Sequence, residues 1–182
     1  MSPILGIWAS ANQAQYISSA SYESIATQSV GSATAFVDFT SIPSTYKHLQ
    51  LRMIGFTTNN FGIRFNSDSS SAYTYHRIVG DGSTAFADGA SSTGRTLATF
   101  GAGNTTTTYP TVAVVDILDY LSTNKTKTLR SLSGNDNNGS GEIKFYSNLW
   151  TATPVAINSI RVLIENGSNI GANSHFALYG IK

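Results

Sequence analysis

The sequence predicts an all-β fold, either a sandwich or a barrel of short strands. Three observations lead to this prediction: apolar and polar side chains alternate with a period of two from residue 33 onward, turn-forming dipeptides separate the alternating runs, and no long helical pattern is sustained. Regularly spaced short strands with turn signals between them are typical of both architectures.

Residues 1–30 differ from the rest of the chain. The opening is apolar, and the part that follows is a Ser/Ala/Gln background with one charge, Glu23. Such a segment is either a frayed terminus or an arm that docks on another chain. The docking interpretation depends on four large apolar side chains that are costly to leave in water, namely Ile4, Leu5, Ile7 and Trp8.

The sequence pattern of residues 31–182 predicts a single domain of ten strands. Within 61–67, Phe61, Ile63 and Phe65 occupy alternate positions, and residues 156–165 alternate in the same way. The other predicted strands are 34–40, 46–56, 72–79, 95–100, 111–117, 127–133, 141–150 and 174–181.

The connections carry residues that suit tight turns. The dipeptides are Asp81-Gly82, Asn138-Gly139 and Asn166-Gly167, all of which tolerate a positive φ. One segment also fits a helical pattern, and there we expect the strand to end at Ile117 and a short helical turn to cover residues 119–123.

Composition excludes several function classes. Charged residues are 12% of the chain and the net charge is +1, so the basic patch that nucleic-acid binding needs is missing. The polar surface comes from serine, threonine and asparagine, which together supply 60 of the 182 residues. No run is long and apolar enough to span a membrane, and the opening lacks the basic region of a secretory signal.

Motifs typical of catalysis and cofactor binding are absent from the sequence. The sequence has no nucleophile elbow, phosphate-binding loop or cysteine, so we predict neither an enzyme nor a cofactor. The three histidines are far apart, and we predict no metal site. Residues 133–142 resemble the first half of a calcium loop but fit a hairpin turn better. The only neighbouring carboxylates, Asp116 and Asp119, suit structural roles.

Aromatic side chains leave two interpretations open. Tyr73 and Tyr75 share one face of a predicted strand, and Tyr146 and Trp150 share a face of another. Exposed pairs of this kind stack on sugar rings, whereas buried pairs belong to a core. Burial is the default expectation for aromatic residues in a domain of this size.

Several segments spread along the chain are distinctive when taken together in this order. They are YKHLQLRMIGFTTNN (46–60), IRFNSDSSSAYTYH (63–76), DILDYLSTNKTKTLRSLSGNDNNGSGEI (116–143), FYSNLW (145–150), the following AINSIRVLIENG, the ending SHFALYGIK and the opening MSPILGIWAS. Together they resemble a family of tailed-bacteriophage virion proteins from phages of aquatic and cyanobacterial hosts. The resemblance covers nearly the whole chain. It implies a non-enzymatic, jelly-roll-like β-sandwich with an extended N-terminal arm, displayed on the virion as a trimer.

The leading hypothesis from this resemblance is a capsid decoration, or cement, protein. The sandwich would form a homo-oligomer, and the arm around Ile4, Leu5, Ile7 and Trp8 would bind the major capsid protein of the virion, which is assembled in the host cytoplasm. The alternative is a tail-fibre or receptor-binding module that recognises a host surface glycan. Head or tail placement, copy number, strand order and cation binding at the 133–142 loop are left open.

Overall fold

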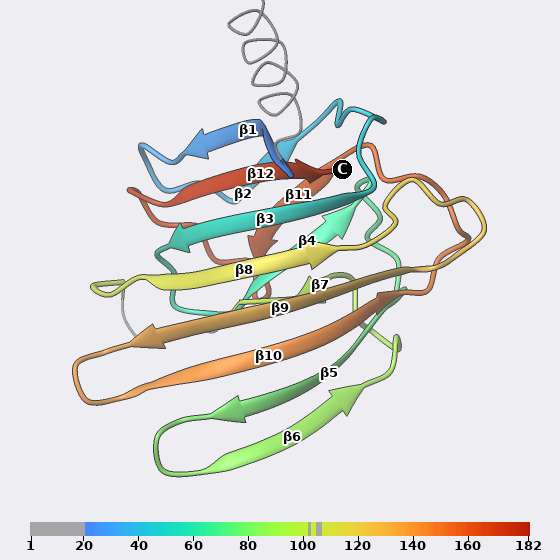
Figure 1. Ribbon diagram of the computed structural model, residues 1–182. Helices are drawn as coiled ribbons and strands as arrows, with labels where there is room; N and C mark the ends of the chain where they lie inside the picture. Colours follow the sequence, from blue (N-terminus) through green and yellow to red (C-terminus); the bar gives the residue numbers. More distant parts are fainter. Residues whose placement is uncertain (1–20, 102, 105–106) are drawn as a thin grey trace, which may run out of the picture.

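The computed structural model describes residues 21–101, 103–104 and 107–182, which form two antiparallel β-sheets packed face to face (Figure 1). No helix occurs in this part of the chain. The predicted all-β sandwich is therefore confirmed. The sheets are unequal, with eight strands in one and four in the other, and the jelly-roll strand order stays a prediction.

The larger sheet has the strand order β1-β12-β3-β8-β9-β10-β5-β6. In that order its strands are Tyr22–Ser29, His175–Ile181, His48–Gly55, Thr111–Ile117, Lys127–Asp136, Gly141–Trp150, Tyr73–Gly80 and Ala85–Ala90. The smaller sheet has the order β2-β11-β4-β7, with strands Phe36–Phe39, Ile160–Ile164, Phe61–Phe65 and Ala98–Thr99.

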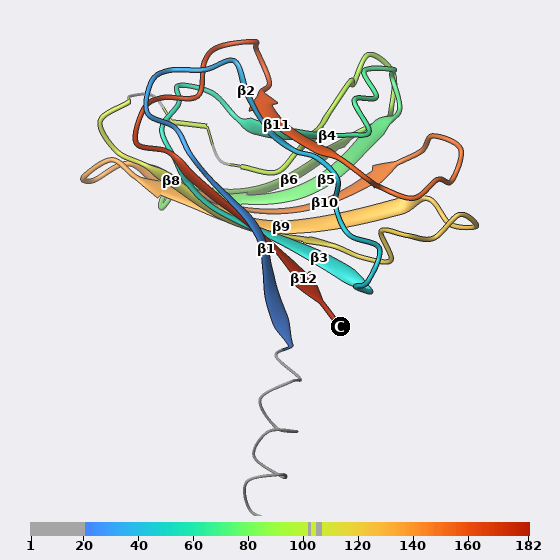
Figure 2. The ribbon, with the colours of Figure 1, turned by 90° about the horizontal axis from the view of Figure 1, so that it is seen from above.

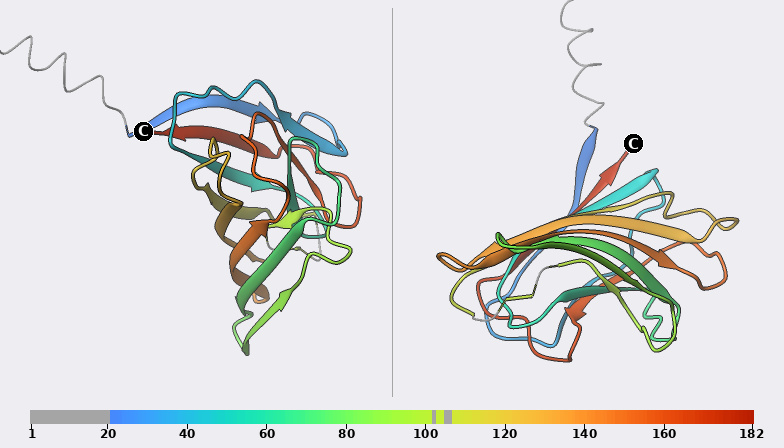
Figure 3. Two further views of the ribbon diagram at one scale, coloured as in Figure 1. Left: turned by 90° about the vertical axis from the view of Figure 1, so that its right-hand side faces the viewer. Right: turned by 90° about the horizontal axis from the view of Figure 1, so that it is seen from below.

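The larger sheet is curved, and the smaller sheet lies on its concave side (Figure 2). Views from the side and from below show the same arrangement, with β1 and the end of β12 together at one corner (Figure 3). The concave face of the larger sheet is called the inner face below, and its convex face the outer face.

All ten predicted strands are present, and the structure adds β1 and β6. The strand β6, Ala85–Ala90, was missed because its side chains apart from Phe86 are short and show no apolar–polar alternation, and almost all of the strand is exposed. A tight turn connects it to β5: the Asp81 amide donates to the Thr84 carbonyl, and Gly82 has φ +89°.

β1 corrects the predicted boundary between arm and sandwich. Tyr22–Ser29 pairs with β12 along its length, with a bulge between Ser24 and Ala26. These residues belong to the sandwich, although they fall within residues 1–30, which were expected to form the arm. An edge strand with polar side chains on both faces shows no alternation, so its sequence gave no strand signal.

The segment after β8 is a turn rather than the expected short helix. The Ser122 amide donates to the Asp119 carbonyl at 2.9 Å, and Asp119 itself has φ +48°, a left-handed conformation that a helix start does not allow. Tyr120, buried in this turn, donates its hydroxyl to the Pro43 carbonyl. The turn is thereby fixed to the loop before β3.

The apolar core lies between the smaller sheet and the β12, β3 and β8 part of the larger one. Phe61 packs on Phe100 and Phe176, with ring centroids 6.1 and 6.0 Å apart. A second aromatic group extends the core toward β5 and β10, and consists of Phe65, Tyr73 and Trp150. Beyond this group, the inner face of the larger sheet becomes polar.

Candidate functional site

Strand β10 places its side chains contrary to the usual pattern of a sandwich. Lys144, Tyr146 and Asn148 point inward and are buried, at 6%, 0% and 2% exposure. Ile143 and Phe145 point outward and are 64% and 47% exposed. Because burying charged and polar groups costs free energy unless they are paired, this inversion makes both faces of the strand candidate binding surfaces.

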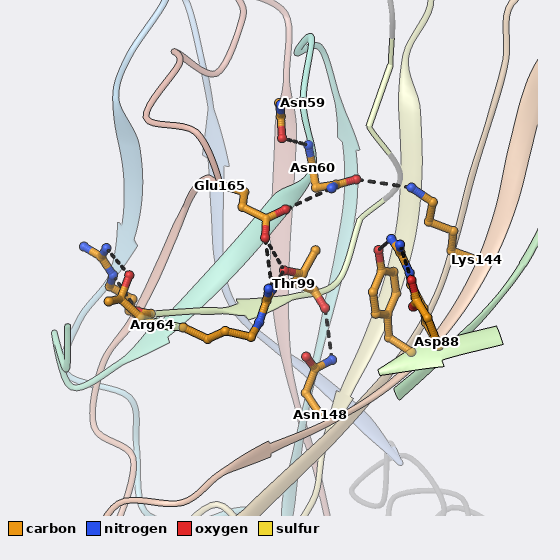
Figure 4. Close-up of polar contacts among 12 residues, drawn as sticks. Asn59, Asn60, Arg64, Asp88, Thr99, Lys144, Asn148 and Glu165 are labelled. Carbon is orange, nitrogen blue, oxygen red and sulfur yellow. Dashed lines mark hydrogen bonds and ion pairs between the residues drawn. The ribbon is translucent and has the colours of Figure 1, made fainter. Parts of the chain in front are cut away.

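On the inner face, Glu165 at the end of β11 gathers three donors (Figure 4). Its Oε1 accepts from Arg95 Nη2 at 2.9 Å and from Thr99 Oγ1 at 3.2 Å. Its Oε2 accepts from Asn60 Nδ2 at 2.9 Å. Residues from the loop before β4, from the segment that leads into β7 and from β7 itself therefore meet at one carboxylate.

Lys144 joins this group from the larger sheet. Its ammonium donates to Asn60 Oδ1 at 3.3 Å and pairs with Glu142 Oε1 at 2.6 Å. Figure 4 shows the Lys144 chain reaching across to Asn60, which links it to Glu165. The hydrogen bonds thus connect the two sheets where the apolar core has ended.

Arg77 adds a second set of hydrogen bonds to this group, from strand β5. It binds Asp88 on β6 with two hydrogen bonds of 2.6 and 2.8 Å, and its Nη1 donates to the Tyr146 hydroxyl at 3.3 Å. The hydrogen bond with Asp88 raises the pKa of Arg77, and the same bond holds the pKa of Asp88 below its usual value. Burial raises the pKa of Tyr146 to about 12, so its hydroxyl stays protonated at neutral pH.

A cavity of about 140 Å³ lies among these side chains. In its lining, the Arg95 guanidinium lies 4.4 Å from the centre of the Tyr75 ring, and Tyr75 meets the Tyr146 ring edge-on at 6.0 Å. The lining residues are Asn60, Tyr75, Arg77, Arg95, Thr99, Tyr146 and Glu165. We call them, together with Asp88, Glu142 and Lys144, the inner polar cluster.

Two buried oxygens near this cluster have no hydrogen-bond partner among the described residues: Ser133 Oγ and Asn148 Oδ1. Asn148 lies directly opposite Tyr75 in the β10–β5 register, and its Nδ2 donates to the Thr99 carbonyl at 3.0 Å. Ser133 lies opposite Lys144 in the β9–β10 register. Unsatisfied buried oxygens beside a polar cavity indicate hydrogen-bonding capacity that the protein itself leaves unused.

The inner polar cluster suits hydrogen bonding to a ligand rather than coordination of a metal ion. Each of its carboxylates accepts from a cationic side chain, and nowhere in the described part of the chain do three or more His, Asp or Glu side chains group as metal ligands would. What it offers a ligand is a set of fixed hydrogen-bond donors and acceptors in a partly enclosed space.

The outer face of the same strands is a second candidate. Val114, Leu132, Phe145 and Ile78 lie opposite one another across β8, β9, β10 and β5, and all four are exposed. With Val112 and Ile143 in the next row they form a surface that we call the outer apolar face.

Hollows flank this row on both sides. One, of about 640 Å³, opens where Gly80 and Gly134 have no side chain, and the other, of about 530 Å³, lies beside Ala87 and Gly89. Monomeric proteins rarely leave a contiguous apolar surface of this kind in water, and such surfaces mark contacts with other molecules.

The predicted docking residues Ile4, Leu5, Ile7 and Trp8 lie outside the described residues, so the structure places none of them. The 133–142 loop is a hairpin turn, as expected: Asn138 and Gly139 have φ +59° and +108°, and Asp136 Oδ1 accepts from the Asn138 amide. Tyr73 and Trp150 belong to the apolar core and Tyr146 is fully buried, which confirms the default expectation for these three, whereas Tyr75 is half-buried beside the cavity.

The two carboxylates that are neighbours in the sequence, Asp116 and Asp119, make separate contacts. Asp116 accepts from Gln50 and Arg130 on the outer face, while Asp119 pairs with Lys125 in the turn. The three histidines lie on three strands, His48 on β3, His76 on β5 and His175 on β12.

Comparison with known proteins finds little. No family model matches the chain, and no curated protein matches it. Among solved structures, a chain described as alginate lyase Aly36B aligns over 86% of this chain and 79% of its own length, with 11% sequence identity and a TM-score of 0.31. At that level the likeness says nothing about the activity of this chain. Among the described residues, no helix has the length and apolar character to cross a lipid bilayer.

Proposed function

We propose that this chain is a non-enzymatic structural protein of a bacteriophage particle, a capsid decoration protein that assembles through its outer apolar face. The observation that carries the proposal is the row of Val114, Leu132, Phe145 and Ile78, exposed side by side across four strands. Removing apolar surface from water contributes about 25 cal/mol per Å², so covering this face favours association.

The partner that best fits this face is a second copy of the chain. The row of large side chains forms a ridge, and the two hollows beside it are shaped by glycine and alanine. A ridge flanked by hollows fits a copy of itself, with the ridge of one face entering a hollow of the other. The six residues of the outer apolar face carry no charge, and the charged residues nearby lie in the linings of the hollows: Asp81, Asp136 and Glu142 in the larger one, and the paired Arg77 and Asp88 in the other.

We propose the virion as the location of this assembly because of the resemblance to virion proteins. A low-charge sandwich that self-associates suits repeated display on a shell, and an apolar N-terminal segment with Ile4, Leu5, Ile7 and Trp8 suits attachment to the major capsid protein. Binding only to the assembled shell would stabilise it by mass action. The proposed location is accordingly the virion.

Self-association is tested with Phe145→Asp, which puts a charge in the centre of the outer apolar face. Sedimentation velocity at micromolar concentration should show an oligomer for the unchanged protein and a monomer for the variant. Thr128→Asp, exposed on the same side of β9 but away from the apolar row, is the matched control and should stay oligomeric. An unchanged protein that is monomeric throughout would overturn the proposed contact.

Placement on the capsid is tested by quantitative mass spectrometry of purified particles. A copy number comparable to that of the major capsid protein supports a decoration protein. A few copies per particle would instead indicate the tail, where receptor-binding modules reside, and absence from the particle would contradict both. This measurement is independent of which surface makes the contact.

A further inference from the structure

The cavity of the inner polar cluster retains hydrogen-bonding groups that the fold does not use. Arg95 donates from Nη2 alone, to Thr99 and Glu165, so its Nε and Nη1 groups make no hydrogen bond to the described residues. The Tyr75 hydroxyl likewise has no partner in the described part of the chain, and the Oδ1 of Asn148, opposite Tyr75, is buried without one. Arg95 and Tyr75 both line the cavity, whereas Asn148 lies behind Tyr75 in the sheet register. The unused groups of the lining are therefore guanidinium donors and one hydroxyl, which donates and accepts.

The positions of these groups are fixed before any ligand arrives. The Arg95 guanidinium is held between Glu165 and the face of the Tyr75 ring, with Thr99 as a third contact. Tyr146 on the cavity wall is fixed by Arg77, which Asp88 orients in turn. A site that is already ordered loses little conformational entropy on binding, which favours affinity even for a small ligand.

Charge balance in the cluster selects against an anion. Arg77 pairs with Asp88, Arg95 with Glu165 and Lys144 with Glu142, at 2.6, 2.9 and 2.6 Å. A ligand carboxylate or phosphate would compete with a carboxylate already in place, whereas hydroxyl groups donate and accept at once and match a mixed lining. The chemistry of the site is that of a neutral, hydroxylated ligand.

The size of the cavity limits the ligand to one unit. Its 140 Å³ equals about five water molecules at roughly 30 Å³ each. This space holds most of one sugar ring, and a longer chain would leave its other units in solvent. We propose that the cavity between the two sheets binds a single neutral sugar ring, with Arg95 and Tyr75 as hydrogen-bonding residues, a site that goes beyond the proposed assembly function.

The test is saturation-transfer NMR on the full chain with glucose, galactose and mannose, each free and as the methyl glycoside, and with galacturonic acid as the acidic counterpart. We expect transfer to at least one neutral sugar, with weaker or no transfer to the acid. Binding to the acid alone, or to none of the sugars, would overturn the proposal.

Two variants assign the binding to the cavity. Tyr75→Phe removes one hydroxyl and keeps the ring under Arg95, and Arg95→Gln removes the unused donors; each should weaken binding of the neutral sugar at least tenfold. Arg52→Gln is the matched control, because Arg52 also stacks on tyrosine rings, those of Tyr22 and Tyr179, but on the outer face. Equal loss in the control, or unchanged binding in Tyr75→Phe, would contradict the assignment.

Discussion

The two halves of the larger sheet have opposite polarity. A single row of inward-facing residues runs across it in register, and its members change from apolar to charged along the way: Leu178, Leu51, Val115, Ser131, Tyr146, Arg77 and Asp88. The adjacent outward-facing row changes the other way: Arg52, Val114, Leu132, Phe145 and Ile78. The inner row changes between β8 and β9, and the outer row changes one strand earlier, between β3 and β8.

This difference separates the side chains that stabilise the fold from those that remain available for contact with other molecules. In the β12, β3 and β8 part the inner side chains form the core, and on the outer side Gln50, which is buried, hydrogen-bonds to Asp116. In the β10 and β5 half the inner side chains form the inner polar cluster, and the apolar ones lie outside. A sheet stable enough through one half can carry binding surfaces on the other.

The largest expected effect distinguishes leucines of the two halves. Leu51→Ala opens a cavity in the core and should lower the free energy of unfolding by about 2–5 kcal/mol. Leu132→Ala, on the outer apolar face, should change it by no more than about 0.5 kcal/mol. Urea unfolding of dilute, monomeric protein measures both, and similar losses would show that the halves do not differ as described.

An intermediate effect concerns the buried cation of the inner polar cluster. Lys144→Met leaves the Glu142 carboxylate and the side-chain Oδ1 of Asn60 without their partner and should cost about 1–3 kcal/mol of unfolding free energy. Arg130→Met breaks the exposed pair with Asp116 on the outer face and should cost less than about 1 kcal/mol. A larger loss at Arg130 would reverse the assignment of the polar half.

The smallest effect is a pH dependence in the alkaline range. Because burial raises the pKa of Tyr146 from 10 in the unfolded chain to about 12, its stabilising effect is complete below pH 10 and lost between pH 10 and 12. Each pH unit in that interval removes up to about 1.4 kcal/mol.

Tyr146→Phe should therefore make the alkaline loss of stability shallower. It should not abolish the loss, because burial also raises the pKa of Tyr73 and its contribution remains. Thermal melts from pH 8 to 12 compare the two proteins, and superimposable profiles would exclude Tyr146 as a source.

Much of the fold could be predicted from the sequence, because alternation and turn dipeptides report strands directly. What alternation does not report is which face turns inward. In β10 the rule that apolar side chains face the core would bury Ile143 and Phe145 and expose Lys144, the reverse of the structure. The expected burial of Tyr146 and Trp150 does indicate the inward face of β10 correctly, because Lys144 and Asn148 lie on that same face.

The inner polar cluster itself was not predicted. Arg77, Arg95, Lys144 and Glu165 are far apart in the sequence, and only the pairing of β10 with β5 and the packing of the two sheets bring them together. No local sequence motif identifies any of these four residues. The outer apolar face was missed for the same reason, since it consists of one or two residues from each of four strands.

The corner at which β1 begins is also where the chain ends: Tyr22 lies opposite Ile181, and Lys182 pairs with Glu23. A domain whose first and last strands are neighbours can be circularly permuted, with a short linker joining residues 21 and 182 and new termini opened at the Asn138-Gly139 turn. The same geometry lets the sandwich be inserted as a cassette into a surface loop of another protein, with its outer apolar face still open to contact.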